Sequence, residues 1–146
     1  MKTSVKIEGQ EKLVKELRRF GEKADDGLHV ISEATGQALR LDIMAGYNEG
    51  NKVGIVYQKY NPRREHQASE EGQAPASDTG RLANSVTYKS TTGGAEVFTE
   101  VEYGPWLEWG TQNIAPRPLW VPEVNKATPV YIQRLRKFLR KLTNEG

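Results

Sequence analysis

Apolar residues change their spacing twice along this chain of 146 residues, and these changes most constrain its fold. Near the N-terminus they recur every three or four residues, as on one face of a helix. In the middle they alternate with polar residues, as in half-buried strands, and towards the C-terminus the helical spacing returns. The sequence therefore predicts an α+β fold in a single domain spanning 1–146. We expect a small antiparallel or mixed sheet with a central hairpin, packed against two N-terminal helices and a C-terminal helix.

The N-terminal periodicity is interrupted by a glycine. Apolar residues from Leu13 to Phe20 predict a first helix, which Gly21 is expected to end. A second helix should begin near Asp25 or Asp26 and end at Gly46, with a stripe formed by Leu28, Ile31, Ala34, Ala38, Leu41 and Ala45. Gly36 costs a helix about 1 kcal/mol relative to alanine, so we expect another element to approach closely there. Before these helices, Val5 and Ile7 alternate with charged residues and predict a short strand.

The clearest local pattern is a hairpin over about 84–102. Two alternating segments flank the turn Thr91-Thr92-Gly93-Gly94, and counting outward places Lys89 opposite Glu96. The outer face of the second strand would carry Glu96, Glu100 and Glu102. A terminal helix should then run from about Pro122 or Ala127 to Leu142, with an apolar stripe of Tyr131, Leu135, Phe138, Leu139 and Leu142.

Between the helices and the hairpin, the chain becomes polar. Residues 52–57 read as a strand, but 58–78 contain Gly, Pro and mixed charges without periodicity. Connections longer than about 12–15 residues are usually functional or disordered. The sequence therefore predicts a long flexible loop over about 58–78, which we expect to order on assembly.

Composition excludes several classes of function. Hydrophobic residues make up 36% of the chain, and no apolar run approaches the length of about 18 residues that a membrane span requires. The chain has no cysteine and two histidines, so disulfides and thiol chemistry are excluded and no cofactor or metal site is expected. No nucleophile–base pair or phosphate loop suggests catalysis. We therefore expect a protein that is not an enzyme, with no small-molecule substrate and no membrane association.

Charge is unevenly distributed although the net charge is only +2. The terminal helix carries a basic group and no acid between Lys126 and Lys141: Arg134, Arg136, Lys137, Arg140 and Lys141. Residues 95–124 are acidic, with five glutamates against Arg117 alone. This pattern fits head-to-tail pairing of copies, although two ordinary solvated faces are an equally simple interpretation. A DNA-associated protein using the basic helix is the alternative function, with at most non-specific contact with DNA.

The tripeptide Asp78-Thr79-Gly80 has two interpretations. An aspartic protease built from two chains would need such a motif at the tip of a buried strand, but Ala76 and Ser77 precede it and Arg81 follows it. The simpler interpretation is a capped turn, in which Asp78 accepts backbone N–H bonds, Gly80 takes a special backbone conformation and Leu82 enters the core.

Trp106, Trp109 and Trp120 lie close together beside glycines and prolines. Core packing is the default for a tryptophan, but aromatic residues on such irregular segments also serve as interface anchors. Glu108 lies between two of them. It is either a solvated side chain, or a salt bridge or backbone cap across a subunit boundary.

Two ordered groups of residues resemble a known family. The first is small-Pro-x-x-Asp-Thr-Gly-x-Leu-x-x-Ser-hydrophobic, formed by Pro75, Asp78, Thr79, Gly80, Leu82, Ser85 and Val86. The second contains Tyr103, Leu107, Glu108, Trp109, Gly110, Thr111, Pro116, Arg117, Pro118, Leu119 and Pro122. Together with the basic helix, and over about Gly54 to Leu142, they resemble the tail-completion family of tailed bacteriophages, the gene-product-ten-like neck and tail components of lambdoid siphophages. Trp106 and Trp109 depart from the family pattern, which often has a small residue and Phe there.

The resemblance implies a structural virion protein of a phage or prophage that acts in tail completion and head–tail joining. Such a protein would form a ring, with a hexamer as one candidate, and would contact other neck and tail proteins. It would reside at the head–tail junction or tail, and in the host cytoplasm before assembly. We expect interface residues at Asp78, Arg81, Trp106, Glu108, Trp109, Arg117 and Trp120, with Arg117 as an ion-pair donor to Glu108 of the same or a neighbouring chain.

Overall fold

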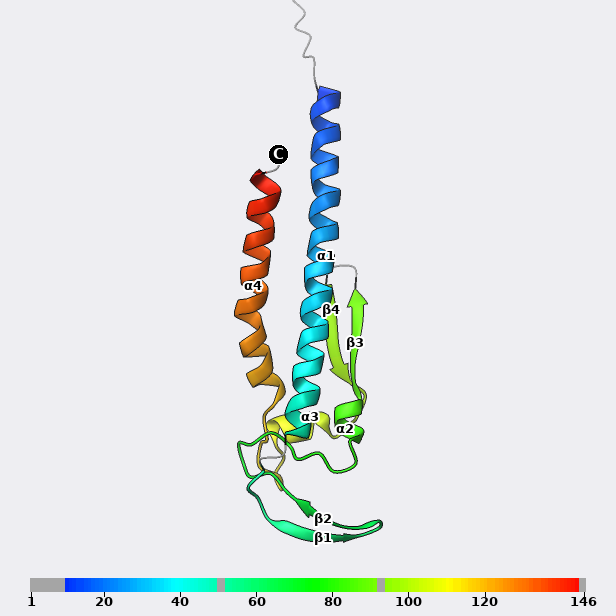
Figure 1. Cartoon of the computed structure of the whole chain (residues 1–146), viewed down its shortest axis with the longest axis vertical. Coiled ribbons are helices and arrows are strands. Elements are labelled where there is room, and N and C mark those ends of the chain that lie inside the picture. Colours follow the sequence, from blue (N-terminus) through cyan, green and yellow to red (C-terminus); the bar gives the residue numbers. More distant parts are fainter. Residues whose placement is uncertain (1–9, 50–51, 92–93, 145–146) are drawn as a thin grey trace, which may run out of the picture.

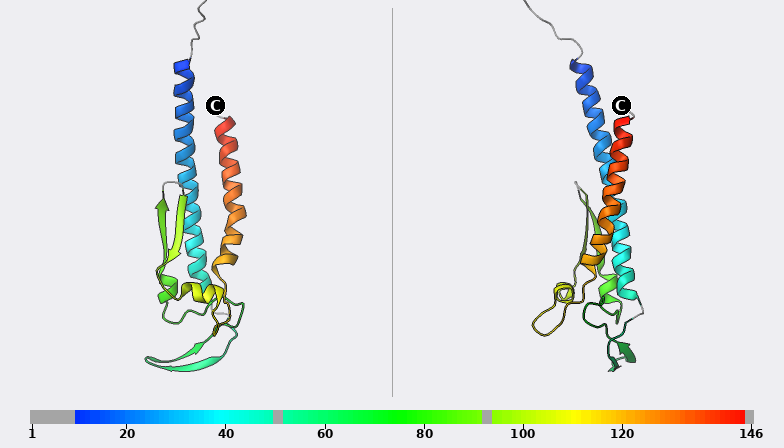
Figure 2. Two further views of the ribbon diagram at one scale, coloured as in Figure 1. Left: turned by 180° about the vertical axis from the view of Figure 1, so that it is seen from behind. Right: turned by 90° about the vertical axis from the view of Figure 1, so that its left-hand side faces the viewer.

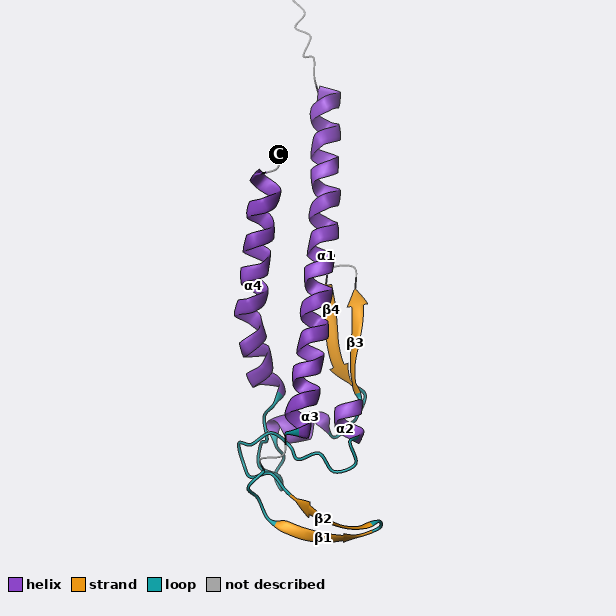
Figure 3. Ribbon diagram, viewed as in Figure 1, coloured by secondary structure: helices purple, strands orange, loops and turns teal. Residues whose placement is uncertain are grey.

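The computed structural model describes residues 10–49, 52–91 and 94–144 and confirms the α+β class. Two long helices and a hairpin run side by side, and a second hairpin lies at one end of the molecule (Figures 1 and 3). The elements are α1 (Gln10–Asn48), β1 (Val56–Tyr60), β2 (Arg63–Gln67), α2 (Arg81–Asn84), β3 (Val86–Thr91), β4 (Gly94–Thr99), α3 (Gly104–Trp109) and α4 (Trp120–Asn144). The strand expected at Val5–Ile7 and the turn residues 92–93 lie outside the described residues.

A single helix, α1, replaces the two predicted N-terminal helices. It has 39 residues and is about 58 Å long at 1.5 Å per residue. Gly21 does not end it, because the apolar positions keep alternating steps of four and three residues across this glycine: Leu13, Leu17, Phe20, Ala24, Gly27 and Ile31. One glycine costs about 1 kcal/mol in a helix, which continuous packing along one face offsets.

α4 and the β3–β4 hairpin pack on different sides of α1 (Figures 1 and 2). The Phe138 ring of α4 lies over Gly27, where an added Cβ would come within 2.0 Å of it. On the hairpin side, a Cβ at Gly36 would lie 2.7 Å from Ala95 Cβ and 3.0 Å from the Tyr88 ring. The predicted close approach at Gly36 is therefore confirmed.

The β3–β4 hairpin has the predicted register. Lys89 pairs with Glu96, and Val86 pairs with Thr99. Strand alternation turns Val86 and Val97 towards the core, whereas Glu96 is exposed.

The hydrophobic core is small and lies where α1 ends. It contains Ile43, Tyr47, Ala83, Val86 and Leu119. The predicted stripe of α1 is wrong at four of its six positions, because Leu28, Ala34, Leu41 and Ala45 are exposed. Residues spaced four apart, including Ile43 and Tyr47, face the core instead.

The segment predicted as a loop contains a second hairpin. β1 and β2 pair in antiparallel order, with Tyr57 opposite His66, so the prediction of an irregular loop over 58–78 is wrong for most of its first ten residues. This hairpin lies beyond the end of α1 (Figure 1). Residues 68–80 lack regular structure, as predicted.

α4 begins at Trp120, a little before the predicted Pro122. Pro122 lies in the first turn, where a backbone N–H has no acceptor within the helix. Pro129 lies inside the helix. Within the described ranges, no helix is both long and apolar enough to cross a lipid bilayer.

Candidate protein interface

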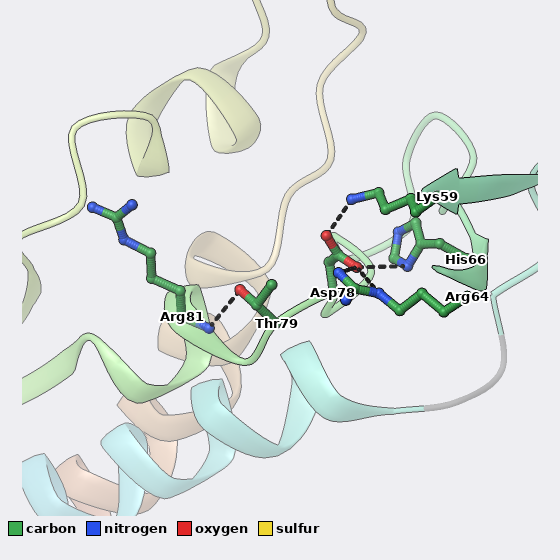
Figure 4. A network of polar contacts seen from close by, with 6 residues as sticks. All are labelled: Lys59, Arg64, His66, Asp78, Thr79 and Arg81. Carbon is green, nitrogen blue, oxygen red and sulfur yellow. Dashed lines mark hydrogen bonds and ion pairs between the residues drawn. The ribbon is translucent and has the colours of Figure 1, made fainter. Parts of the chain in front are cut away.

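Asp78 joins the β1–β2 hairpin to the rest of the molecule (Figure 4). Its carboxylate accepts hydrogen bonds from Lys59 Nζ and from Arg64, whose Nη2 lies 2.6 Å from Oδ1. His66 Nδ1 is 3.5 Å from the same oxygen. These three partners come from β1 and β2, so one side chain holds both strands against the turn before α2.

The turn that follows Asp78 matches the sequence prediction only in part. Gly80 has φ 74° and Leu82 packs against the core, as predicted. The prediction that Asp78 caps backbone N–H groups is wrong, because its carboxylate is bonded to side chains. Thr79 Oγ1 instead accepts the backbone N–H of Arg81 at 3.4 Å. The Arg81 guanidinium points away from the cluster (Figure 4).

The environment of Asp78 favours the ionised carboxylate. The hydrogen bond from Lys59, and then that from Arg64, lower the pKa of Asp78 below its usual range. A proton-sharing pair of aspartates in a protease would need the opposite effect on one carboxyl group.

Asp78→Asn should loosen the β1–β2 hairpin, because an amide cannot pair with two cations. Amide hydrogen exchange over 56–67 should become faster near neutral pH, while exchange around Ile43 stays unchanged. Because the pKa of Asp78 is lower in the folded chain, its contribution is fully present above the unfolded value of about 3.8 and is lost as the pH falls through the lower folded value. In the wild type, the protection of residues 56–67 from exchange should decrease as the pH falls through the folded pKa of Asp78. In Asp78→Asn, this decrease should be absent. The exposed control is Asp26→Asn. If residues 56–67 exchanged equally fast in Asp78→Asn and in this control, Asp78 would not hold the β1–β2 hairpin in place.

Glu108 of α3 caps the N-terminus of α4. It is buried, with 7% of its surface exposed. Its Oε2 accepts the N–H groups of Leu119 at 2.8 Å and Trp120 at 3.0 Å, and its Oε1 accepts that of Val121 at 2.8 Å. A carboxylate here satisfies unpaired donors and opposes the positive end of the helix dipole. The solvated interpretation of Glu108 is therefore wrong, and the backbone cap exists within one chain.

Arg117 does not pair with Glu108 in this chain. Its Nη1 donates to Ser69 Oγ at 2.9 Å, and its backbone N–H donates to Leu107 O at 2.7 Å. Its Nε is buried without a hydrogen-bond partner in the described part of the chain. Arg117 therefore ties the loop before α4 to the segment that follows β2.

The motif residues between α3 and α4 form a tight loop. Gly110 has φ 74° and ψ 177°, and Thr111 donates its N–H to Ile114 O at 2.8 Å. Pro116 O accepts the N–H of Gly72 at 3.0 Å, which links this loop to the segment containing the buried Pro75. Pro118 precedes the buried Leu119.

The three tryptophans occupy different environments. Trp120 is half-buried, and its Nε1 donates to Tyr47 Oη at 2.7 Å. Burial raises the pKa of Tyr47 to about 12. Trp106 and Trp109 are 54% and 71% exposed. Trp120 thus belongs to the core, whereas the other two lie on the surface.

The surface around α3, which we call the Trp patch, consists of Trp106, Trp109 and an adjacent apolar hollow of about 250 Å³. Phe98, Pro105, Trp109 and Val121 line the hollow. An exposed aromatic residue beside an apolar depression is the usual anatomy of a protein contact.

Two further surfaces escaped the sequence analysis. The face of α1 that packs on α4 continues towards the N-terminus, where Leu13 and Leu17 are 58% and 61% exposed. Leu142 and Phe20 contribute to a groove of about 430 Å³ there. At the other end of the molecule, Ile55 and Tyr60 are 79% and 83% exposed. The unbroken heptad spacing of α1 was the signal for the first surface.

The predicted basic group lies on α4, and all its members are exposed: Arg134, Arg136, Lys137, Arg140 and Lys141. Among the residues that the structure describes, no His, Asp and Glu side chains are grouped as metal ligands would be. Searches against protein-family models, curated proteins and solved structures find no match to this chain.

Proposed function

We propose that this chain is a structural virion protein of a tailed phage or prophage, acting in tail completion and head–tail joining at the neck as an oligomeric ring. The observation that carries the proposal is the large number of exposed hydrophobic side chains. In the described residues, exposed large hydrophobic side chains outnumber the buried hydrophobic residues. Such a chain has much to gain from association and offers little enclosed space for a substrate.

The exposed apolar groups have the distribution that an assembly subunit needs. Three groups of them lie at the N-terminal end of α1, in the Trp patch and on β1, which are separate parts of an elongated molecule (Figure 2). Several contact surfaces allow a subunit to meet neighbours of its own kind and other neck or tail proteins at once. The ordered motifs described above supply the phage context.

The Trp patch is the contact that we expect to matter most for joining. A phage that encodes this chain, with its gene interrupted, should accumulate unjoined heads and tails in electron micrographs. Supplying the wild-type chain should restore joined particles, whereas Trp106→Ala/Trp109→Ala should lower the number of infectious particles by about tenfold or more. Loss of two exposed anchors should leave the fold intact, which circular dichroism can verify.

The matched control is Leu41→Ala, which removes a 58% exposed apolar side chain of α1 that lies outside these three surfaces. Normal joined particles without the chain would refute the function. Full complementation by the double tryptophan variant would refute the role of the patch.

The basic residues of α4 support one alternative function, that of a DNA-associated protein. Binding to duplex DNA would then weaken steeply with salt, because released counterions drive phosphate contacts. Such binding, unaffected by Trp106→Ala/Trp109→Ala but lost in Arg136→Glu/Arg140→Glu, would favour this alternative.

A further inference from the structure

The two outer layers of the molecule lie on different sides of α1. Gly27 faces α4 and Gly36 faces the β3–β4 hairpin. Nine residues at 3.6 per turn leave these two positions about half a turn apart. Figures 1 and 2 show α4 and the hairpin flanking α1 accordingly. Each layer therefore has an outer face that points away from the other layer.

The outer face of α4 is basic with an apolar member. Tyr131 and Phe138 contact α1, so residues about half a turn away point outward. These outward residues include Arg136 and Arg140, both exposed. Ile132, one turn before Arg136, lies about a third of a turn from Tyr131 and Phe138 and borders these outward residues; it is 40% exposed. We call Ile132, Arg136 and Arg140 the basic face.

The outer face of the β3–β4 hairpin is acidic with an apolar member. Because Ala95 contacts Gly36 and Val97 packs against the core, Glu96 and Phe98 point to the other side. Glu100 follows in the same alternation and is exposed. Lys89 lies opposite Glu96 and offsets part of this charge, but Glu100 has no such cross-strand partner in the described register. We call Glu96, Phe98 and Glu100 the acidic face; Phe98 also lines the hollow of the Trp patch, so this face borders that patch.

We propose that the basic face of one copy docks on the acidic face of a second copy. Opposite charges would bring the copies together and fix their orientation, while Ile132 and Phe98 would be covered at the contact. The occupant of each face is a second copy because the same chain carries the complementary face. The proposal rests on the proposed function only for its biological setting.

This contact is head-to-tail. When two copies pair, one keeps a free basic face and the other a free acidic face, on outer sides of the pair. Addition of copies therefore continues, and it closes into a ring if the rotation per step is suitable. A two-fold symmetric dimer would use one patch twice and would stop at two copies.

Charge reversal tests the contact on purified full-length protein. Sedimentation velocity at low salt should show wild-type association that rises with concentration and weakens with added salt. Arg136→Glu/Arg140→Glu alone, and Glu96→Lys/Glu100→Lys alone, should each raise the apparent dissociation constant by about tenfold or more, because like charges then face each other. An equimolar mixture of the two variants should associate again, since each variant carries a face complementary to the other's.

The matched control for the arginine variant is Lys15→Glu/Arg18→Glu, which makes the same change in net charge on exposed residues of α1 outside both faces. It should associate like the wild type. A wild type that stays monomeric at low salt, or a mixture that fails to recover association, overturns the proposed contact. Either result leaves the head–tail joining test untouched, because that test measures particles formed with other neck proteins. If normal phage particles formed without the chain, the proposed function would be rejected. Association in the mixture of the two charge variants would still support the contact.

Discussion

Replacing Glu108 by alanine is expected to lower the free energy of unfolding by about 3–5 kcal/mol. The carboxylate is buried and accepts three backbone N–H groups at the start of α4. Each of those donors would lose its acceptor in a place where water enters poorly, at a cost of about 1–3 kcal/mol each. Urea unfolding followed by tryptophan fluorescence measures the loss, because Trp120 lies in the capped turn.

Two controls separate the cap from a general effect of charge. Glu108→Gln keeps one acceptor oxygen, so it should destabilise by about half as much or less. Glu102→Ala removes an exposed glutamate nearby and should change stability by less than about 0.5 kcal/mol. If Glu108→Ala behaved like Glu102→Ala, the cap would contribute nothing to folding.

Gly110→Ala is expected to destabilise the chain by about 3 kcal/mol or more. With φ 74° and ψ 177°, Gly110 occupies a region that only glycine visits readily. An added Cβ would also lie 2.7 Å from Ile114 O and 3.0 Å from Pro116 N, both backbone atoms. The loop between α3 and α4 would have to open, and this would disturb the geometry that brings Glu108 to α4. Thermal and urea unfolding measure the loss.

Gly72→Ala is the matched control, because Gly72 has φ 77° but no atom within 4 Å of an added Cβ. Gly72→Ala should lower the free energy of unfolding by about 1–2 kcal/mol, through backbone strain alone. Equal losses at the two glycines would mean that crowding at Gly110 has no effect on stability.

The sequence predicts local structure well where charge and periodicity agree. The β3–β4 hairpin follows from alternation around a glycine turn, and pairing of Lys89 with Glu96 confirms the register. The β1–β2 hairpin escapes prediction because its strands are mostly polar, and a single remote carboxylate, Asp78, holds them. Its composition is that of a loop, and the stabilising partner comes from a different segment.

The sequence predicts which residues belong to the candidate site, but it does not predict which partners they contact. The sequence predicts functional roles for Glu108 and Arg117 but predicts that they pair with each other. Glu108 instead accepts hydrogen bonds from backbone N–H groups 11–13 residues further along the chain. Arg117 donates a hydrogen bond to Ser69, 48 residues earlier. Such partners depend on how the loop after Gly110 folds back, which no periodic pattern encodes. The fold of this loop also explains why Trp106 and Trp109 are exposed while Trp120 is half-buried.

The Glu108 cap also connects α3 mechanically to α4. One buried carboxylate fastens α3, with Trp109 as its next residue, to the first turn of α4. α4 then runs for about 37 Å along α1. Its far end is held as well, because Phe138 lies over Gly27 and Leu142 is only 7% exposed. A force applied at Trp109 would therefore reach the first turn of α4 directly, and the packing along α1 would resist movement of the rest of the helix.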